Sequence, residues 1–262
     1  MIDFAYKEAY TVADLKEIIK ILRSDHGCPW DREQTHGSIR RNFLEEAYEA
    51  VEAIDEGNME HLREELGDVL TQVVFHAAIE EERGGFDLDA VADGTCKKLI
   101  YRHPHIFGET EVSDSAEVMT NWDVLKRKEK GQKTVVSAMD AVAKSLPALW
   151  RAEKVQDKAK KVGFDWPDVS GALQKLREET EELGQAIQDN GNVREELGDL
   201  LFSAVNVARF LSVDPEQALH EASEKFIRRF QKVEQMASEG KKSLEEMTLE
   251  EMDALWDKAK KA

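Results

Sequence analysis

Two acidic phrases recur in the chain, and each consists of a Glu-x-x-Glu pair followed by a Glu-x-x-Asp pair. The carboxylates are Glu46, Glu49, Glu65 and Asp68 in the first half, and Glu179, Glu182, Glu196 and Asp199 in the second. On a helix, residues three apart are neighbours on one face, so each pair directs two carboxylates at the same point. Two such helices packed together would form a site of four carboxylates.

The residues around the Glu-x-x-Asp pairs favour a metal site over a solvated helix face. In the second half, apolar residues between Leu197 and Ala208 cover most of the helix and leave Glu196 and Asp199 in a narrow polar stripe. Such a helix is expected to be buried, as is its counterpart in the first half, and a buried carboxylate must be paired, protonated or bound to a cation. The facing Glu-x-x-Glu helix adds only negative charge. The pattern therefore predicts a cation with oxygen ligands, Mg²⁺ or Mn²⁺.

Other catalytic designs fit the sequence poorly. A di-iron centre needs a Glu-x-x-His motif on each of two helices, and only Glu33 with His36 matches it. The histidines and cysteines form no zinc-ligand set, and the chain has neither a glycine-rich phosphate loop nor a Gly-x-Ser-x-Gly elbow. The chemistry that remains is metal-assisted attack by water.

Pairs of cationic and aromatic residues also recur, in the same order after the acids. A Lys-x3-Arg pair and a Trp-x3-Lys pair occur in both halves: Lys98 and Arg102 with Trp122 and Lys126, then Lys225 and Arg229 with Trp256 and Lys260. Lysine and arginine four residues apart share a helix face and suit phosphate oxygens. They would also suit surface ion pairs with nearby glutamates, and either tryptophan could serve only as a core anchor.

Composition narrows the class of protein. With 54 acidic and 36 basic residues among 262, the formal net charge is −18, which opposes nonspecific binding to nucleic acid or anionic lipid. No apolar run is long enough to span a membrane, so we expect no membrane partner and a cytoplasmic location. Cys28 and Cys96 form no Cys-x-x-Cys motif and are expected to be reduced.

The periodicity predicts an all-α fold, and the internal repeat predicts two tandem helical domains, at residues 1–130 and 131–262. Expected helices in the first domain cover residues 11–23, 38–56, 59–82, 87–101 and 115–129. Those in the second cover residues 138–160, 170–189, 192–212, 214–239 and 248–261. Glycine and proline residues lie at most of the intervening breaks.

Four motifs together resemble the all-α nucleoside triphosphate pyrophosphohydrolases of the MazG type, in their two-domain form. They are Gly27-Cys28-Pro29-Trp30-Asp31 with Gln34-Thr35-His36, Glu64-Glu65-Leu66-Gly67-Asp68, Arg102-His103-Pro104-His105-Ile106-Phe107-Gly108, and Val162-Gly163-Phe164-Asp165-Trp166. The resemblance covers essentially the whole chain. It implies hydrolysis of a nucleoside triphosphate to the monophosphate and pyrophosphate, in a homodimer whose helical bundles are completed by dimerisation.

The resemblance also implies roles for particular residues. Glu179, Glu182, Glu196 and Asp199 would be the Mg²⁺ ligands and catalytic carboxylates, with Glu46, Glu49, Glu65 and Asp68 as a second set. The residues implied in nucleotide binding are Lys175, Glu195, Lys225, Arg229, Trp256 and Lys260, and more weakly Lys98, Arg102, Trp122 and Lys126.

The two halves differ at one implied position, because Lys175 in the second corresponds to Asn42 in the first. We therefore expect the second half to be the principal catalyst and the first to be weaker, regulatory or structural. The alternative function is a nucleotide sensor or dimer scaffold, in which the acids hold a structural metal without turnover.

Overall fold

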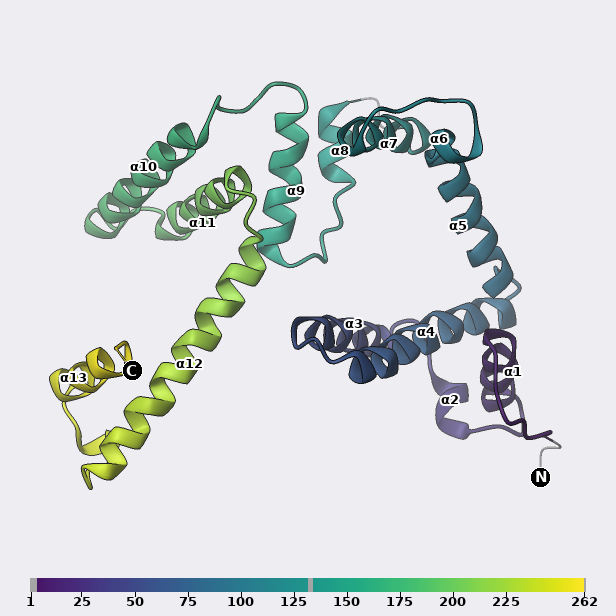
Figure 1. Ribbon diagram of the computed structural model, residues 1–262, viewed down its shortest axis with the longest axis horizontal. Helices are drawn as coiled ribbons and strands as arrows, with labels where there is room; N and C mark the ends of the chain where they lie inside the picture. The colour runs from purple at the N-terminus through teal and green to yellow at the C-terminus, as the bar shows by residue number, and fades with distance from the viewer. Residues whose placement is uncertain (1–3, 132–133, 262) are drawn as a thin grey trace. The chain divides into compact units, whose positions relative to one another are not determined.

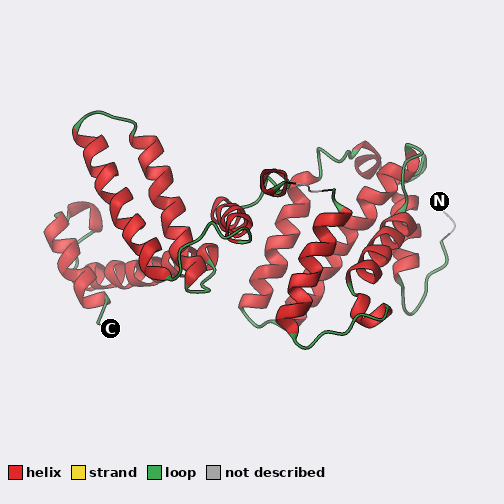
Figure 2. Cartoon of the chain, turned by 90° about the horizontal axis from the view of Figure 1, so that it is seen from above, coloured by secondary structure: helices red, strands yellow, loops and turns green. Residues whose placement is uncertain are grey.

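The computed structural model describes residues 4–131 and 134–261, and every regular element in these residues is a helix (Figure 2). The all-α prediction is therefore confirmed. The chain divides into two compact units, Met1–Lys126 and Arg127–Ala262. The predicted division after residue 130 stays a prediction about domain organisation.

The first unit is built around a long helix that carries the Glu-x-x-Asp pair (Figure 1). Its helices are α1 (Val12–Arg23), α2 (Pro29–Glu33), α3 (Arg40–Asp55), α4 (Met59–Glu82), α5 (Leu88–Arg102), α6 (Pro104–Phe107) and α7 (Ser115–Glu129). Helix α4 packs against α3 along its N-terminal part and against α1 further on. The main buried cluster joins α1 to α4 and consists of Ile19, Ile39, Val74, Phe75, Ala78 and Ile79.

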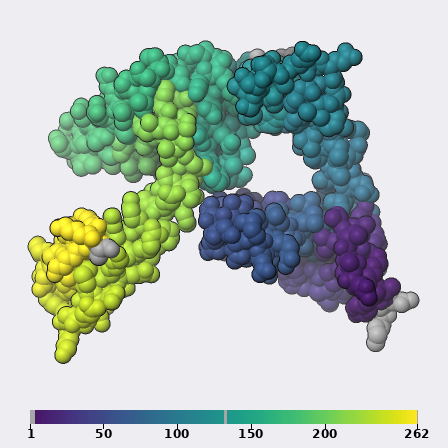
Figure 3. Space-filling view, viewed as in Figure 1, coloured from purple at the N-terminus to yellow at the C-terminus, as the bar shows by residue number. Residues whose placement is uncertain are grey.

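The second unit repeats the hairpin that carries the acids. Its helices are α8 (Val135–Asp140), α9 (Ala148–Lys160), α10 (Val169–Gln188), α11 (Val193–Phe210), α12 (Pro215–Glu239) and α13 (Leu249–Ala259), with a short 3₁₀ helix, η1, at Leu244–Glu246. Helix α11 packs against α10 and α9, whereas α13 packs against α12. In Figures 1 and 3, α12 runs away from the α10–α11 pair and carries α13 along its C-terminal half.

Side-chain caps explain where the acid-bearing helices begin. Asn58 and Asn192 precede α4 and α11, and each side-chain oxygen accepts a hydrogen bond from a backbone N–H of the first turn. Such a cap satisfies a donor that has no partner within the helix. Gly57 and Asn190 adopt positive φ just before these caps, so the chain reverses within a few residues. The two acid-bearing helices of each unit therefore lie antiparallel and side by side (Figure 1).

Nine of the ten predicted helices match observed helices to within two residues at each end, but the expected helix at 138–160 is wrong. That region forms two helices, α8 and α9. Pro147 is the N-cap residue of α9, and proline disfavours helical backbone at the residue before it. The short helices α2 and α6, which each begin at a proline, and η1 were also not expected. Proline is suited to the first helical position because its fixed φ matches the helix.

Candidate metal and nucleotide site

The second unit brings the predicted carboxylates together at the α10–α11 contact. One oxygen from each of Glu179, Glu196 and Asp199 lies within 4.8 Å of the others. Glu179 is only 5% exposed, while Asp199 at the same cluster is open to solvent. The side chain of Glu182 is hydrogen-bonded to Glu179. Burial raises the pKa of Glu182 above its ordinary value, although the charge of Lys175 opposes this effect. The arrangement is an acidic cluster with one buried ligand and one open side, which could hold a metal ion.

Lys175 supplies the positive charge closest to this cluster. Its Nζ lies 2.6 Å from Glu179 Oε1 and 2.7 Å from Glu178 Oε1. Hydrogen bonds to these two carboxylates raise the pKa of Lys175 above its ordinary value. The spacing of four residues between Lys175 and Glu179 was the available signal for this ion pair. The buried carboxylate therefore has a neutralising partner within its own helix, in addition to the cation predicted from the sequence.

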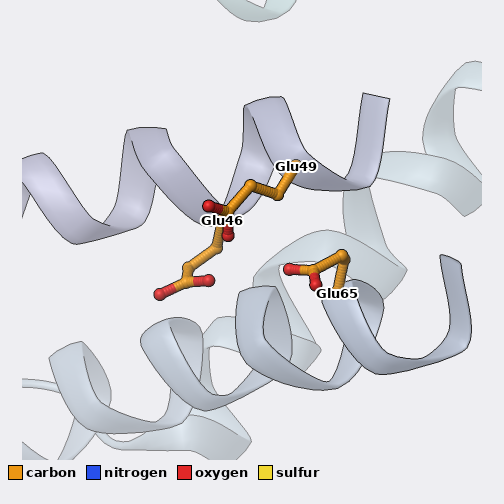
Figure 4. A group of neighbouring side chains, drawn as sticks. All are labelled: Glu46, Glu49 and Glu65. Atoms are coloured by element: carbon orange, nitrogen blue, oxygen red, sulfur yellow. The ribbon is translucent and has the colours of Figure 1, made fainter. Parts of the chain in front are cut away.

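The first unit contains the matching cluster of Glu46, Glu49 and Glu65, whose side chains converge between α3 and α4 (Figure 4). Glu65 is 7% exposed, and His61 Nε2 lies 3.2 Å from its Oε1. The other oxygen, Oε2, is buried without a hydrogen-bond partner among the described residues. A buried carboxylate oxygen of this kind is costly unless a cation or donor meets it. The donor set of this site therefore also fits a metal ion.

Burial and mutual repulsion perturb the first cluster. Burial raises the pKa of Glu46, and the charges of Asp68, Glu49 and Glu65 add to the effect. Burial likewise raises the pKa of Glu65, helped by the charge of Glu49. Asp68 is thus within electrostatic reach of the cluster, although its oxygens lie outside the group of three. A bound cation would relieve this repulsion.

The prediction that the Glu-x-x-Asp helices are buried nearly all round is wrong for the single chain. On α11, Leu197, Leu201 and Phe202 are exposed, and on α4 Leu66 is exposed. The apolar pattern covers more of each helix than the neighbouring helices of one chain can cover. Besides Glu65, the buried residues of α4 lie in its C-terminal half, and those of α11 are Ser203 and Val205. Among the eight acids of the two clusters, Glu65 and Glu179 are the buried ones.

The repeated cations of the first unit are packed on an aromatic ring. The Arg102 guanidinium lies 5.1 Å from the centroid of the Trp122 ring, and Lys126 Nζ lies 4.6 Å from the same centroid. Arg102 is buried, and Lys98 lies one turn earlier on α5. The structure thus brings Arg102 and Lys126 together on the ring of Trp122. Their role in nucleotide binding stays a prediction.

In the second unit, the corresponding residues lie on α12 and α13. Trp256 packs on Phe226, with the ring centroids 5.0 Å apart, and Lys260 Nζ lies 2.9 Å from Asp257. Lys225 and Arg229 project from α12. In residues 134–261, no hydrogen bond or ion pair joins Lys225, Arg229 or Lys260 to the second acidic cluster.

Glu195, another residue implied in nucleotide binding, is engaged at the start of α11. Asn192 Nδ2 donates to Glu195 Oε2 over 2.5 Å, and Asn192 Oδ1 accepts from the Glu195 backbone N–H. In this chain, Glu195 therefore helps to fix the first turn of the helix that carries Glu196 and Asp199.

A pocket of about 560 Å³ opens beside the second acidic cluster. Glu179, Asp199 and Lys175 line it, together with residues of the α9–α10 loop and of the C-terminal part of α11. Two of the lining residues form an ion pair, in which Arg209 Nη2 lies 2.6 Å from Asp165 Oδ1. Sequence reasoning quoted the motif that contains Asp165 but assigned no function to it, and it did not identify Arg209. The size lies within the usual range for small-molecule sites.

The structure gives no sign of a membrane segment in the residues that it describes. None of the described helices combines the length and the apolar character that spanning a bilayer requires.

Comparison with known proteins finds a family that the sequence of this chain matches. Residues 34–107 and 169–234 match the sequence profile of the MazG nucleotide pyrophosphohydrolase domain. The chain is 46% identical over 247 residues to the nucleoside triphosphate pyrophosphohydrolase/pyrophosphatase MazG of Thermotoga maritima, covering 94% of each chain. It is 41% identical over 252 residues to the nucleoside triphosphate pyrophosphohydrolase of Escherichia coli K12, covering 94% of this chain and 96% of that one. It also matches half of the uncharacterized protein YabN of Bacillus subtilis, with 46% identity.

Proposed function

Because the chain belongs to the MazG family of nucleotide pyrophosphohydrolases, we propose that it hydrolyses nucleoside triphosphates, ribose or deoxyribose, to the monophosphate and diphosphate. The oxygen of a water molecule forms a bond to phosphorus while the phosphoanhydride bond between the α- and β-phosphates breaks, which gives the monophosphate and releases diphosphate. The observation that carries the proposal is the convergence of Glu179, Glu196 and Asp199 within 4.8 Å, beside a pocket of nucleotide size that Glu179 and Asp199 line.

We infer that the cation held by these acids is Mg²⁺, with Mn²⁺ as a possible substitute, because every ligand in the cluster is a carboxylate oxygen. When bound, such an ion neutralises phosphate charge and activates water. Glu179, Glu182, Glu196 and Asp199 would hold it. One of these carboxylates would also orient the attacking water and accept its proton.

Lys175 has a second task in this scheme. In the free chain its Nζ neutralises Glu179. A cation on the cluster would take over that neutralisation, and Lys175, which lines the pocket, would then turn to a phosphate oxygen. The same positive charge would thus stabilise the empty site and afterwards bind the substrate.

We further propose that the second unit is the principal catalyst. Support comes from Lys175, which has no counterpart at Asn42, and from the pocket that adjoins the second cluster. The first unit would bind a cation through Glu46, Glu49, Glu65 and Asp68, with weaker turnover or none.

The working form would be a homodimer. The exposed apolar residues of α11 and α12, among them Leu197, Leu201 and Phe226, support this proposal, because a second copy could cover them. In a dimer, Lys225, Arg229, Trp256 and Lys260 would be available to a nucleotide held at a bundle that both chains complete.

Product analysis tests the proposed function. The full-length protein and its Glu196→Gln variant are incubated with mixed nucleoside triphosphates and Mg²⁺, and the products are separated. We expect monophosphate and diphosphate from the wild type and a loss of both in the variant. A Glu65→Gln variant is the matched control in the first unit and should retain turnover. Release of nucleoside diphosphate and phosphate would show that the bond between the β- and γ-phosphates is cleaved, contrary to the proposal. No turnover at all would favour a sensor or scaffold.

A further inference from the structure

The pocket beside the second acidic cluster contains polar groups that neither the metal nor the phosphates require. Glu179 and Asp199 line one part of it. The other lining residues include Gln156, aromatic residues of the α9–α10 loop, and Asn206, which lies about two turns after Asp199 on α11. A triphosphate and its cation account for the acidic end alone. The other end has the chemistry of a site for a planar molecule with hydrogen-bonding edges.

Gln156, on α9, leaves a buried acceptor in this wall. The residue is 7% exposed, and its Nε2 donates to the carbonyl oxygen of Phe202 over 2.8 Å. Since a carbonyl only accepts, the amide nitrogen must face Phe202, which fixes the position of Oε1. Gln156 Oε1 is buried and has no hydrogen-bond partner among the described residues. An unpaired buried acceptor is costly, so a donor is expected to meet it when the pocket is filled.

Asn206, on α11, presents the complementary group. Its Oδ1 accepts hydrogen bonds from Arg209 Nε at 2.9 Å and from Arg209 Nη2 at 2.7 Å. Asp165 holds the same guanidinium through Nη1 at 3.0 Å and Nη2 at 2.6 Å. A guanidinium only donates, so the Asn206 oxygen must face it and the Asn206 Nδ2 is left to donate elsewhere. Asn206 is thus held as a fixed donor at the pocket wall.

The α9–α10 loop adds aromatic surface to the same pocket. Phe164 and Trp166 both line it, directly after Gly163, which has φ of +83°. Trp166 packs so closely on α10 that a Cβ at Gly171 would lie 2.3 Å from its Cδ1. Glycine at 171 therefore permits this placement of the indole. Aromatic side chains beside fixed amide groups are the usual means of binding a base by stacking and edge recognition.

The first unit does not reproduce this arrangement. Asp68 and Asp199 correspond in the repeat, and seven residues after each stand Phe75 and Asn206. Phe75 is 7% exposed and belongs to the core between α1 and α4. Ala78 occupies the position of Arg209 and is also buried in that core. The first unit therefore has neither of these two polar side chains at the corresponding positions.

We propose that the pocket binds the base of the substrate nucleotide, with Asn206 Nδ2 donating to an acceptor on the base edge and Gln156 Oε1 accepting from an adjacent N–H. The inference rests on the proposed function for the position of the triphosphate, which lies toward Glu179, Asp199 and Lys175. Each common base presents a donor next to an acceptor on its pairing edge. Asn206 and Gln156 are therefore specificity-determining residues for the base, and Arg209 with Asp165 positions Asn206.

Binding measurements separate base recognition from phosphate recognition. The full-length protein with Mg²⁺ is titrated by calorimetry with the α,β-methylene analogues of ATP, GTP, CTP and UTP, and with inorganic tripolyphosphate, which has no base. Asn206→Asp removes the Nδ2 donor and keeps the oxygen that Arg209 requires. Gln156→Met removes the acceptor at similar volume. Asn190→Asp, in an exposed turn, is the control for the added charge.

We expect Asn206→Asp and Gln156→Met each to weaken binding of at least one nucleotide analogue about tenfold. Binding of tripolyphosphate should stay at the wild-type value, and Asn190→Asp should resemble wild type with every probe. Thermal melting of each variant shows whether it is still folded. Asn206→Asp is expected to stay folded because it keeps the oxygen that accepts hydrogen bonds from Arg209.

Two results would overturn the inference: unchanged affinity of both folded variants for all four analogues, or an equal loss for the analogues and tripolyphosphate. Failure of the proposed function looks different. If wild type binds the analogues in a base-dependent way that Asn206→Asp removes, yet hydrolyses no nucleoside triphosphate, then the pocket assignment holds and the hydrolase assignment does not.

Discussion

The two acidic clusters share a ligand pattern but differ in what surrounds it. In the second unit, Lys175 lies against the buried Glu179, and a pocket opens next to the acids. In the first, His61 lies against the buried Glu65, and Phe75 fills part of the core further along the same helix. A duplicated set of carboxylates can therefore serve two purposes, because the neighbours decide whether a bound cation has a nucleotide to act on.

The difference follows from which helix covers the C-terminal part of the Glu-x-x-Asp helix. In the first unit, α1 packs there and buries Val74, Phe75 and Ile79. In the second, α9 packs against α11, and the residues of these two helices that line the pocket include the polar Gln156 and Asn206. The contact that holds Phe75 is therefore an apolar core, whereas Asn206 faces a pocket.

The largest effect should come from removing the first carboxylate of the Glu-x-x-Glu pair in each unit. Glu179→Gln should lower kcat/KM for a nucleoside triphosphate by at least about 100-fold, because it removes a cation ligand and the partner of Lys175. Glu46→Gln, at the corresponding position of the first unit, should stay within about twofold. Steady-state kinetics at one Mg²⁺ concentration measures kcat/KM for both variants. Equal losses of kcat/KM in the two variants would contradict the proposal that the second unit is the principal catalyst.

The next largest effect should come from making the second site resemble the first. Lys175→Asn should lower kcat/KM by about 10- to 100-fold, the range expected for a hydrogen bond to a charged group. The reverse change, Asn42→Lys, is made in a Glu196→Gln background so that any turnover reports the first unit. We expect little gain, because that unit still has Phe75 in place of Asn206. A large gain would show that Asn42 alone weakens the first site.

Metal binding should change the pH dependence of stability. Burial raises the pKa of Glu46 and of Glu182 above the ordinary value, so without metal the folded state binds these protons more tightly than the unfolded chain. Their contribution favours folding at low pH and is lost as the pH rises from the ordinary carboxyl pKa through the raised one. Mg²⁺ binds the ionised form and should therefore stabilise the protein more at pH 8 than at pH 5.

At an Mg²⁺ concentration of 100 times Kd, the expected gain is about 2.7 kcal/mol for one site. Thermal melts with Mg²⁺ and with a chelator measure it. Repeating them in Glu46→Gln and in Glu179→Gln assigns the gain to one cluster or to both. A larger Mg²⁺ effect at pH 5 than at pH 8 would rule out ionised carboxylates as the ligands.

The smallest effect should come from the caps, where the two units are most alike. Asn58→Ala and Asn192→Ala each remove a side-chain cap, at a cost of about 1 kcal/mol. Denaturant unfolding of both variants measures how much each substitution lowers the free energy of unfolding. Asn192 also donates to Glu195, so a markedly greater cost there would show that this bond strengthens the second cap.

Much of this protein can be predicted from local patterns. The period of the apolar residues identified the main helices, and asparagine and glycine located the turns before α4 and α11, because both depend on a few neighbouring residues. Pro147 was the local signal that the helix predicted at 138–160 overlooked. The spacing within Glu-x-x-Glu and Glu-x-x-Asp likewise placed carboxylates on single helix faces. The acid clusters were then a consequence of two adjacent helices.

The sequence by itself determined the all-α fold, the repeat and the carboxylates that converge, since helix periodicity and i, i+3 spacing fix which residues share a face. Only the tertiary structure decided which acids are buried, and that Asn206 and Gln156 both line an open pocket while Phe75 is enclosed. These features depend on which helices pack together, and residues as distant as Asp165 and Arg209 are brought into contact only by that packing.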